Sequence, residues 1–174
     1  VPGASAARQR VASDQKGILD ARSLPDSSFD GQWDSIILPD GLKDRLLAQA
    51  VLNFTARGKL QAVSLPVHGV ILLVGPPGTG KTSLARGLAS RTAASLGTAF
   101  TYLEVEPHAL ASAALGKSQQ AVRHLLGTVI AEQAASGPCV VVLDEVETLA
   151  ADRSKMSLEA NPVDVHRATD AALA

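Results

Sequence analysis

Gly75-Pro76-Pro77-Gly78-Thr79-Gly80-Lys81-Thr82 is the most informative stretch of this 174-residue sequence. It fits the phosphate-loop pattern G-x-x-x-x-G-K-[ST] at every position. An unbroken apolar run, Val70 to Val74, precedes it, and a helical pattern opens at Ser83 and continues to about Ser95. The sequence therefore predicts a strand, a loop and a helix in this order, and the coincidence of all three disfavours an accidental match.

The composition of this loop suits it to phosphate. Gly75, Gly78 and Gly80 allow backbone angles that other residues avoid, so successive N–H groups can turn inward at the positive end of the following helix. Lys81 would reach the β- and γ-phosphates of a nucleotide, and the Thr82 hydroxyl would bind Mg²⁺. The residues predicted to bind nucleotide here are Gly75, Pro76, Pro77, Gly78, Thr79, Gly80, Lys81, Thr82 and Ser83.

Composition excludes several other classes of protein. The chain is 46% apolar and 19% charged, which is ordinary for a globular domain. A net charge of -1 and an aromatic content of 3% argue against a general nucleic-acid surface. We expect no membrane span, because no apolar run reaches about 18 residues. The single cysteine, Cys139, lies in an apolar run, which indicates a buried thiol and a reducing, cytoplasmic compartment.

A second chemical signal follows the apolar run Val140 to Leu143. This run predicts a buried strand, and it ends in Asp144 and Glu145. Two carboxylates at the carboxyl end of such a strand lie where open α/β sheets bind ligands. Asp144 would hold Mg²⁺ through water, and Glu145 would accept a proton from the water that attacks the γ-phosphate. A solvated acidic turn is the alternative, and the position after a phosphate loop favours the catalytic interpretation, in which Glu145 and Lys81 are the catalytic residues.

The remaining segments complete an alternation of helices and strands. Residues 1–28 are polar and are interpreted as a linker or an N-terminal tail. Periodicity predicts an amphipathic helix over residues 40–57 and another over residues 119–135. Residues 99–105 are predicted to form a second strand, in addition to the strand at 140–143. The fold class that follows is α/β with a parallel sheet.

Phe29 to Ile37 is a short segment of large apolar residues without clear periodicity. Many phosphate-loop proteins bind the adenine with a segment that precedes the loop, so Ile36 and Ile37 are candidate contacts to the base. Simple core packing by Trp33 and its neighbours is the alternative, and the sequence leaves both open.

Together these motifs resemble those of the AAA+ ATPases. The form GPPGTGKT at residues 75–82, and the strand that ends in Asp144 and Glu145 before Arg153, are similar to that superfamily. Three further stretches resemble the pachytene checkpoint family, whose members remodel HORMA-domain proteins. They are Phe29-Asp30-Gly31-Gln32-Trp33-Asp34-Ser35, Gly80-Lys81-Thr82-Ser83-Leu84 and Pro162-Val163-Asp164.

The resemblance implies a three-layer αβα P-loop NTPase (AAA+) fold that binds Mg²⁺ and ATP. It also implies a ring, usually a homohexamer, whose ATP hydrolysis draws a partner protein into a central pore. The pore loop would fall at residues 113–118, where Ala114 replaces a common aromatic residue and Lys117 a common acidic one. Gripping of substrate by this loop is therefore in question, and a flexible connector is an equal alternative.

The resemblance further implies parts that these 174 residues do not contain. A strand with a polar sensor residue, an arginine finger and a helical lid would follow residue 174. We therefore expect residues 29–174 to be the N-terminal part of an AAA+ large ATPase subdomain, incomplete in this chain and weakly active alone. A phosphate-loop kinase and a nucleotide-dependent loader are the alternative functions.

Overall fold

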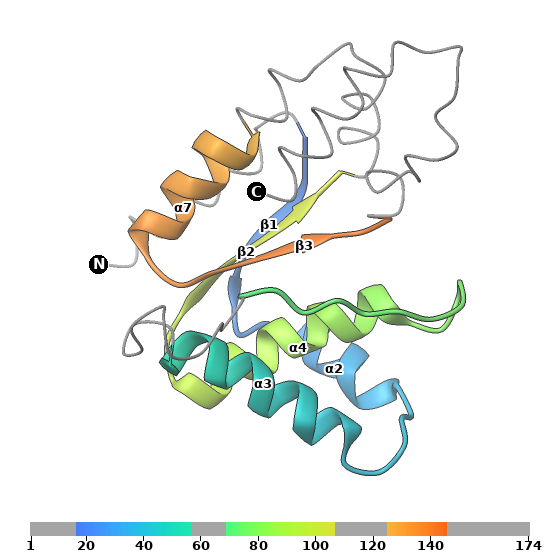
Figure 1. The fold of residues 1–174 in the computed structure, drawn as a ribbon. Helices are drawn as coiled ribbons and strands as arrows, with labels where there is room; N and C mark the ends of the chain where they lie inside the picture. Colours follow the sequence, from blue (N-terminus) through green and yellow to red (C-terminus); the bar gives the residue numbers. More distant parts are fainter. Residues whose placement is uncertain (1–16, 57–68, 107–124, 146–174) are drawn as a thin grey trace, which may run out of the picture. The chain divides into compact units, whose positions relative to one another are not determined.

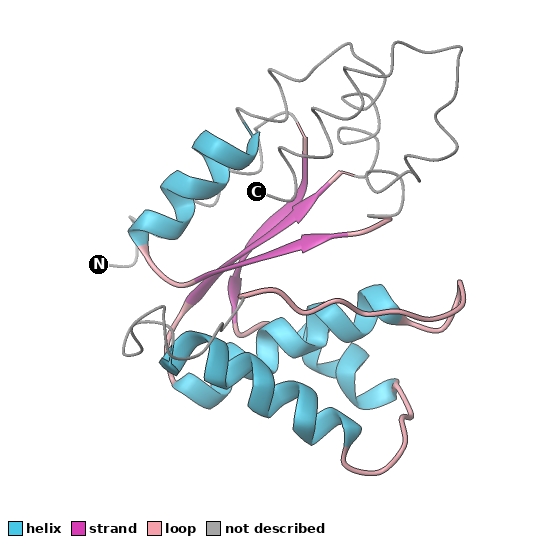
Figure 2. Ribbon diagram, in the orientation of Figure 1, coloured by secondary structure: helices cyan, strands magenta, loops and turns pink. Residues whose placement is uncertain are grey.

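The computed structural model describes residues 17–56, 69–106 and 125–145 of the chain (Figure 1). It contains both helices and strands, as the α/β prediction requires (Figure 2). In chain order the elements are β1 (Ile18–Leu24), α2 (Ser27–Ser35), α3 (Leu42–Ala56), α4 (Lys81–Leu96), β2 (Phe100–Val105), the π-helix η1 (Leu125–Ile130), α7 (Ala131–Ser136) and β3 (Cys139–Leu143).

The chain divides into two compact units. One combines Val1–Arg22 with Thr101–Ala174, and its described part holds most of β1 and β2, together with η1, α7 and β3. The other, Ser23–Phe100, holds α2, α3, the glycine-rich loop and α4. Each unit has its own buried apolar cluster. The glycine-rich loop and the Asp144–Glu145 pair therefore belong to different units.

The sheet has the strand order β1-β2-β3. β2 and β3 run parallel, with Thr101 opposite Cys139 and Val105 opposite Leu143, which confirms the parallel pairing predicted for these two strands. The N–H of Glu106 donates to the carbonyl of Gly17 at 2.9 Å, so the start of β1 lies beside the end of β2 and the two strands are antiparallel. The sheet is therefore mixed.

β1 was not predicted, because residues 1–28 were interpreted from the sequence as a linker or tail. Within that range, residues 18–24 form the strand and Ser27 begins α2. The strand lacks a clean alternation, because only its end residues Ile18 and Leu24 are buried. A period of two is the main sequence signal for a strand, so a strand without it escapes detection.

The core of the first unit lies against β2. Leu103 and Val105 are fully buried and pack with Ile18 and with Val129 of η1. The alternate residues of β2, Tyr102 and Glu104, are also buried, and the Tyr102 hydroxyl donates to a carboxylate oxygen of Glu104 at 2.6 Å. Burial of successive side chains is typical of an interior strand of an α/β sheet.

The predicted helix at 119–135 is confirmed where the structure describes it, as η1 followed by α7. Residues 119–124 lie outside the described residues. Cys139, predicted to be buried, is partly buried against the core of the first unit, and this burial raises the pKa of its thiol to about 11. A thiol with this pKa is almost entirely protonated at neutral pH, so Cys139 is a poor nucleophile.

The second unit is built around α4. Leu84 and Leu88 of this helix pack with Trp33 of α2 and with Ala50 of α3. The predicted helix at 40–57 is α3, and the helix predicted after the glycine-rich loop is α4, which ends at Gly97 in the left-handed conformation. Phe29 to Ser35, interpreted from sequence as non-periodic, is instead part of α2. Asp26 caps this helix by accepting from the Ser28 N–H, and Phe29 and Trp33 are buried one turn apart.

α2 and α4 come very close together at Gly87. A Cβ placed on Gly87 would lie 2.5 Å from the Cβ of Trp33 and 3.0 Å from its Cα. The atoms in the way belong to the backbone and Cβ of Trp33, so no side-chain rotation can make room. The absence of a side chain at residue 87 is therefore what lets the two helices come this close.

We predict that Gly87→Ala destabilises the protein by about 2 kcal/mol, because overlap with the Trp33 backbone outweighs the gain in helix propensity of about 1 kcal/mol. Gly31→Ala in α2 is the matched control, since a Cβ there meets nothing within 4 Å. The free energy of unfolding, measured by denaturant titration, tests both. Equal stability of the two variants would contradict the close packing of α2 on α4.

Candidate functional site

The segment that leads into the glycine-rich loop is not the strand that the sequence predicts. Residues 70–74 form no strand with any of the described strands. Their side chains nevertheless alternate. Ile71 and Leu73 pack against the buried cluster of Trp33, Ala50, Leu84 and Leu88, which we call the Trp33 cluster. Val70, Leu72 and Val74 are 78%, 68% and 86% exposed. The prediction is wrong because a strand requires a hydrogen-bonded neighbour, which an apolar run does not itself supply.

The loop itself has the backbone that the glycine pattern predicts. Gly78 and Gly80 have φ angles of 77° and 82°, in the left-handed region that favours glycine. Gly80 is the N-cap of α4 and makes no side-chain capping bond, while its carbonyl accepts from the N–H of Leu84 at 2.8 Å. The first turn of α4 thus begins directly after the loop, with Lys81, Thr82 and Ser83 as its first residues. No acidic side chain lies in that turn.

Lys81 folds back over the entrance of the loop. Its Nζ donates to the carbonyl oxygens of Gly75 and Pro76 at 2.9 and 2.8 Å. The Thr79 hydroxyl donates to the same Pro76 carbonyl at 2.8 Å. The loop and the first turn of α4 therefore bring together Gly78, Thr79, Gly80, Lys81 and Thr82. The Lys81 ammonium places a positive charge beside the loop backbone.

The structure also brings Ile36 to this loop. A Cβ placed on Gly80 would lie 3.6 Å from Cδ1 of Ile36, so the isoleucine packs directly against the loop backbone. Ile36 is partly buried against the Trp33 cluster, whereas Ile37 is 95% exposed. The two predicted base contacts thus differ: Ile36 is a packed residue beside the loop, and Ile37 presents an apolar surface to solvent.

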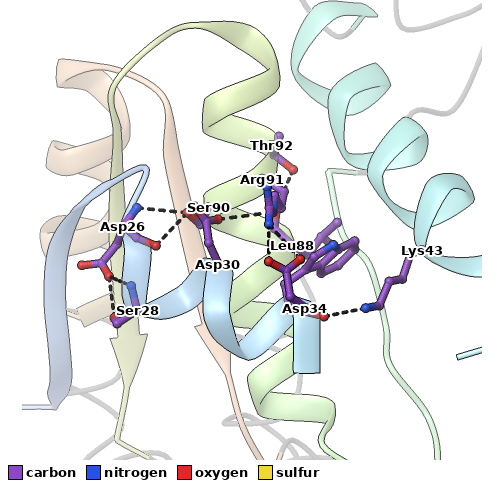
Figure 3. Close-up of polar contacts among 10 residues, drawn as sticks. Asp26, Ser28, Asp30, Asp34, Lys43, Leu88, Ser90, Arg91 and Thr92 are labelled. Atoms are coloured by element: carbon purple, nitrogen blue, oxygen red, sulfur yellow. Dashed lines mark hydrogen bonds and ion pairs between the residues drawn. The ribbon is translucent and has the colours of Figure 1, made fainter. Parts of the chain in front are cut away.

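A cluster of charged residues ties α2 to α4, and we name it the Arg91 cluster, comprising Asp30, Asp34 and Arg91 (Figure 3). Nη2 of Arg91 lies 2.8 Å from both carboxylate oxygens of Asp34, and its Nε lies 3.4 Å from Oδ1 of Asp30. These contacts were not predicted, because Asp34 and Arg91 are 57 residues apart in the chain and Asp30 is farther still. The only available signal was the spacing of Asp30 and Asp34, which puts both carboxylates on one face of a helix.

Further polar contacts to α2 and its N-cap come from Ser90 of α4 (Figure 3) and from Lys43 of α3. The Ser90 hydroxyl accepts from the N–H of Asp26 at 3.0 Å and donates to its carbonyl at 3.2 Å. The Lys43 ammonium of α3 donates to the backbone carbonyl of Trp33, and it lies 5.3 Å from the centre of the Trp33 ring. Both ends of α2 are therefore held by polar contacts.

The carboxylate pair follows β3, as predicted. Asp144 is partly buried and Glu145 is exposed. Glu145 has a φ angle of 53°, unusual for a residue with a side chain, and its N–H donates to Oδ1 of Asp144 at 2.9 Å. Strained backbone at the carboxyl end of a parallel strand is a frequent feature of functional sites.

The donor set in the described residues fits a magnesium–nucleotide complex. Such a complex requires a cation and backbone donors for phosphate, and only a hydroxyl and a carboxylate for the metal, because phosphate oxygens and waters supply its other ligands. Lys81, the loop backbone and Thr82 provide the cation, the backbone donors and the hydroxyl within one unit. The described residues contain no group of three metal-ligating side chains.

Several predicted features lie outside the described residues. They include the candidate pore loop at 113–118, Arg153 and the helix expected from Pro162. Within the described ranges, no helix is both long enough and apolar enough to cross a membrane.

Comparison with known proteins identifies relatives of the chain. CD-NTase-associated protein 6 of Pseudomonas aeruginosa is 64% identical over 159 residues, which cover 91% of this chain and 52% of that protein. A pachytene checkpoint protein 2 homolog of Arabidopsis thaliana is 38% identical over 156 residues, covering 86% of this chain and 33% of that protein. The chain therefore spans about half the length of the bacterial relative and about a third of the plant one.

Two solved structures share the fold. Caenorhabditis elegans PCH-2 matches with a TM-score of 0.68 and 30% identity over 91% of this chain and 40% of its own. A chain of the Escherichia coli MS115-1 HORMA:CdnC:Trip13 complex matches with a TM-score of 0.71 over 90% of this chain and 56% of its own, and its 19% identity shows the fold alone. The predicted AAA+ fold class and the resemblance to pachytene checkpoint proteins are confirmed.

Residues 71–171, which include both the loop and the Asp144–Glu145 pair, match the family described as "ATPase family associated with various cellular activities (AAA)". This match covers more than half of the 174 residues. The chain belongs to the AAA family of ATPases.

Proposed function

We propose that this chain is the nucleotide-binding part of an AAA+ ATPase that binds Mg-ATP, hydrolyses it and remodels a partner protein. The observation that carries this proposal is the glycine-rich loop at the head of α4, with two left-handed glycines and Lys81 against its entrance. Family membership supports nucleotide binding as the use of this loop.

In the proposed complex the loop backbone and Lys81 hold the phosphates. Nζ of Lys81 exchanges its contacts with the Gly75 and Pro76 carbonyls for contacts with the β- and γ-phosphates. The positive end of α4 adds to this attraction, because a helix N-terminus favours an anion. Ile36 and Ile37 lie along the base, an assignment supported by the packing of Ile36 on Gly80.

Hydrolysis is assigned to the carboxylate pair. Glu145 accepts a proton from the attacking water. Asp144, through water, and Thr82, through its hydroxyl, would hold Mg²⁺, which when bound would supply positive charge to offset that of the phosphates. The exposed side chain of Glu145 and its unusual backbone are compatible with a group that reaches toward substrate.

The partner and the assembly are proposed from the relatives. A HORMA-domain protein is the proposed partner, because the chain shares its fold with PCH-2 and shares motifs with the pachytene checkpoint proteins. The structure of the more distant Trip13 relative includes HORMA and CdnC proteins. A homohexameric ring is proposed on the family resemblance, since a neighbouring subunit would supply the transition-state arginine.

Lys81→Ala is predicted to weaken ATP binding by about a hundredfold or more, because it removes charge-assisted hydrogen bonds to phosphate. The measurement is calorimetric titration of the full-length protein with Mg-ATP. Arg45→Ala, which removes an exposed cation from α3, is the control and should leave binding unchanged. Equal affinity of the Lys81→Ala and unaltered proteins would remove the loop from the proposed site.

Glu145→Gln is predicted to keep ATP binding while lowering the hydrolysis rate by about a hundredfold or more, the usual contribution of a general base. Steady-state phosphate release and ATP affinity of the full-length protein are measured in parallel. Glu132→Gln, an exposed change in α7, is the matched control. Undiminished hydrolysis by Glu145→Gln would refute the role of this residue as base.

A further inference from the structure

We propose that the Arg91 cluster positions the nucleotide base, by fixing α2 on α4 and so holding Ile36 and Ile37 beside the phosphate loop. The inference rests on the proposed function, since it concerns the same nucleotide site. Arg91, Asp34 and Asp30 are positioning residues in this proposal, because their contacts join α4 to α2 and they act through α2.

The first step is that one helix carries both the loop and the anchor of α2. α4 begins with Lys81 at the loop, and its residues Gly87, Ser90 and Arg91 contact α2. Residues three and four apart lie on the same face of a helix, so these three positions form one continuous surface for α2. Contacts with α4, the helix that starts at the phosphate loop, therefore determine the position of α2.

The second step is that α2 sets the position of Ile36 almost directly. The helix ends at Ser35, and Ile36 follows as its C-cap with extended backbone angles of -82° and 127°. Asp34 lies in the last turn of α2, one residue away from Ser35. A guanidinium that holds Asp34 therefore restrains the segment from which Ile36 reaches Gly80.

The Arg91 cluster orients α2 more than it stabilises the fold. The Trp33–Gly87 contact and the buried Phe29 already supply apolar packing between α2 and the rest of the unit. Asp34 is 67% exposed at its side chain, so its ion pair is a surface contact that adds little stability. Arg91 instead restrains direction by holding α2 at two points one turn apart, with Nη2 2.8 Å from both oxygens of Asp34 and Nε 3.4 Å from Oδ1 of Asp30. Variants of the cluster should therefore fold while losing the alignment of Ile36 with the loop.

The probes are ADP and inorganic pyrophosphate, which share two phosphates and differ by the nucleoside. Neither requires hydrolysis, so the result is independent of the role of Glu145. Arg91→Met keeps the length of the side chain and removes its charge, with Arg45→Met on α3 as the matched control. Asp34→Ala removes the partner carboxylate, with Asp44→Ala as its control, and it provides a second variant if Arg91→Met does not fold.

We expect both cluster variants of the full-length protein to bind ADP about five- to tenfold more weakly, as the loss of one well-placed apolar contact would give. Pyrophosphate affinity should stay within about twofold, because the loop and Lys81 are untouched. Calorimetric titration, by direct binding for ADP and competition for pyrophosphate, measures both constants, and circular dichroism checks the folding of each variant.

Each result decides. Unchanged ADP affinity in a folded cluster variant would overturn the positioning role. Equal losses for ADP and pyrophosphate would also overturn it, since the cluster would then act on the loop as a whole. Failure of the unaltered protein to bind either probe would instead overturn the proposed function, and the inference with it.

Discussion

The packing of Trp33 on the bare backbone of Gly87 is the contact on which the second unit depends. It brings α2 onto α4 with no intervening side chain, and it places Trp33 in the cluster formed with Ala50, Leu84 and Leu88. Because α2 ends at Ser35, the same contact delivers Ile36 to the backbone of Gly80. The Trp33–Gly87 contact in the core thus determines that Ile36 lies beside the phosphate loop.

The polar contacts around this core have a different role. Apolar packing is weakly directional, whereas a guanidinium between carboxylates and a serine bonded to both backbone groups of Asp26 restrict how α2 can turn. Apolar contacts therefore keep α2 packed against α4, and the Arg91 cluster together with Ser90 restricts its orientation. The proposed base contact at Ile36 depends on both.

The parts of the fold that local sequence determines were predictable. The glycine pattern predicted the loop, because left-handed backbone at Gly78 and Gly80 requires that residue type. Periodicity predicted α3 and α4, and short runs rich in apolar and β-branched residues predicted β2 and β3. The carboxylates after β3 followed from the same reasoning, although the left-handed backbone of Glu145 left no trace in the sequence.

Features that depend on distant partners were not predictable. Val70 to Val74 reads as a strand, yet strand formation depends on a neighbour that the run cannot encode. β1 was missed because its pairing with β2 compensates for a weak pattern. α2 was missed because its two buried aromatic residues, Phe29 and Trp33, are too few to show a helical repeat. The Arg91 cluster was missed because its residues are distant in the sequence and meet only in the folded chain.

The most direct test of the central claim, that this chain holds Mg-ATP on residues 75–82 for hydrolysis by Glu145, is an experimental structure of the full-length Glu145→Gln protein with Mg-ATP. The account predicts the triphosphate inside the loop with Lys81 against it, the base along Ile36, Asp144 near the metal and residue 145 beside the γ-phosphate. A triphosphate bound away from residues 75–82, or residue 145 far from the γ-phosphate, would contradict it.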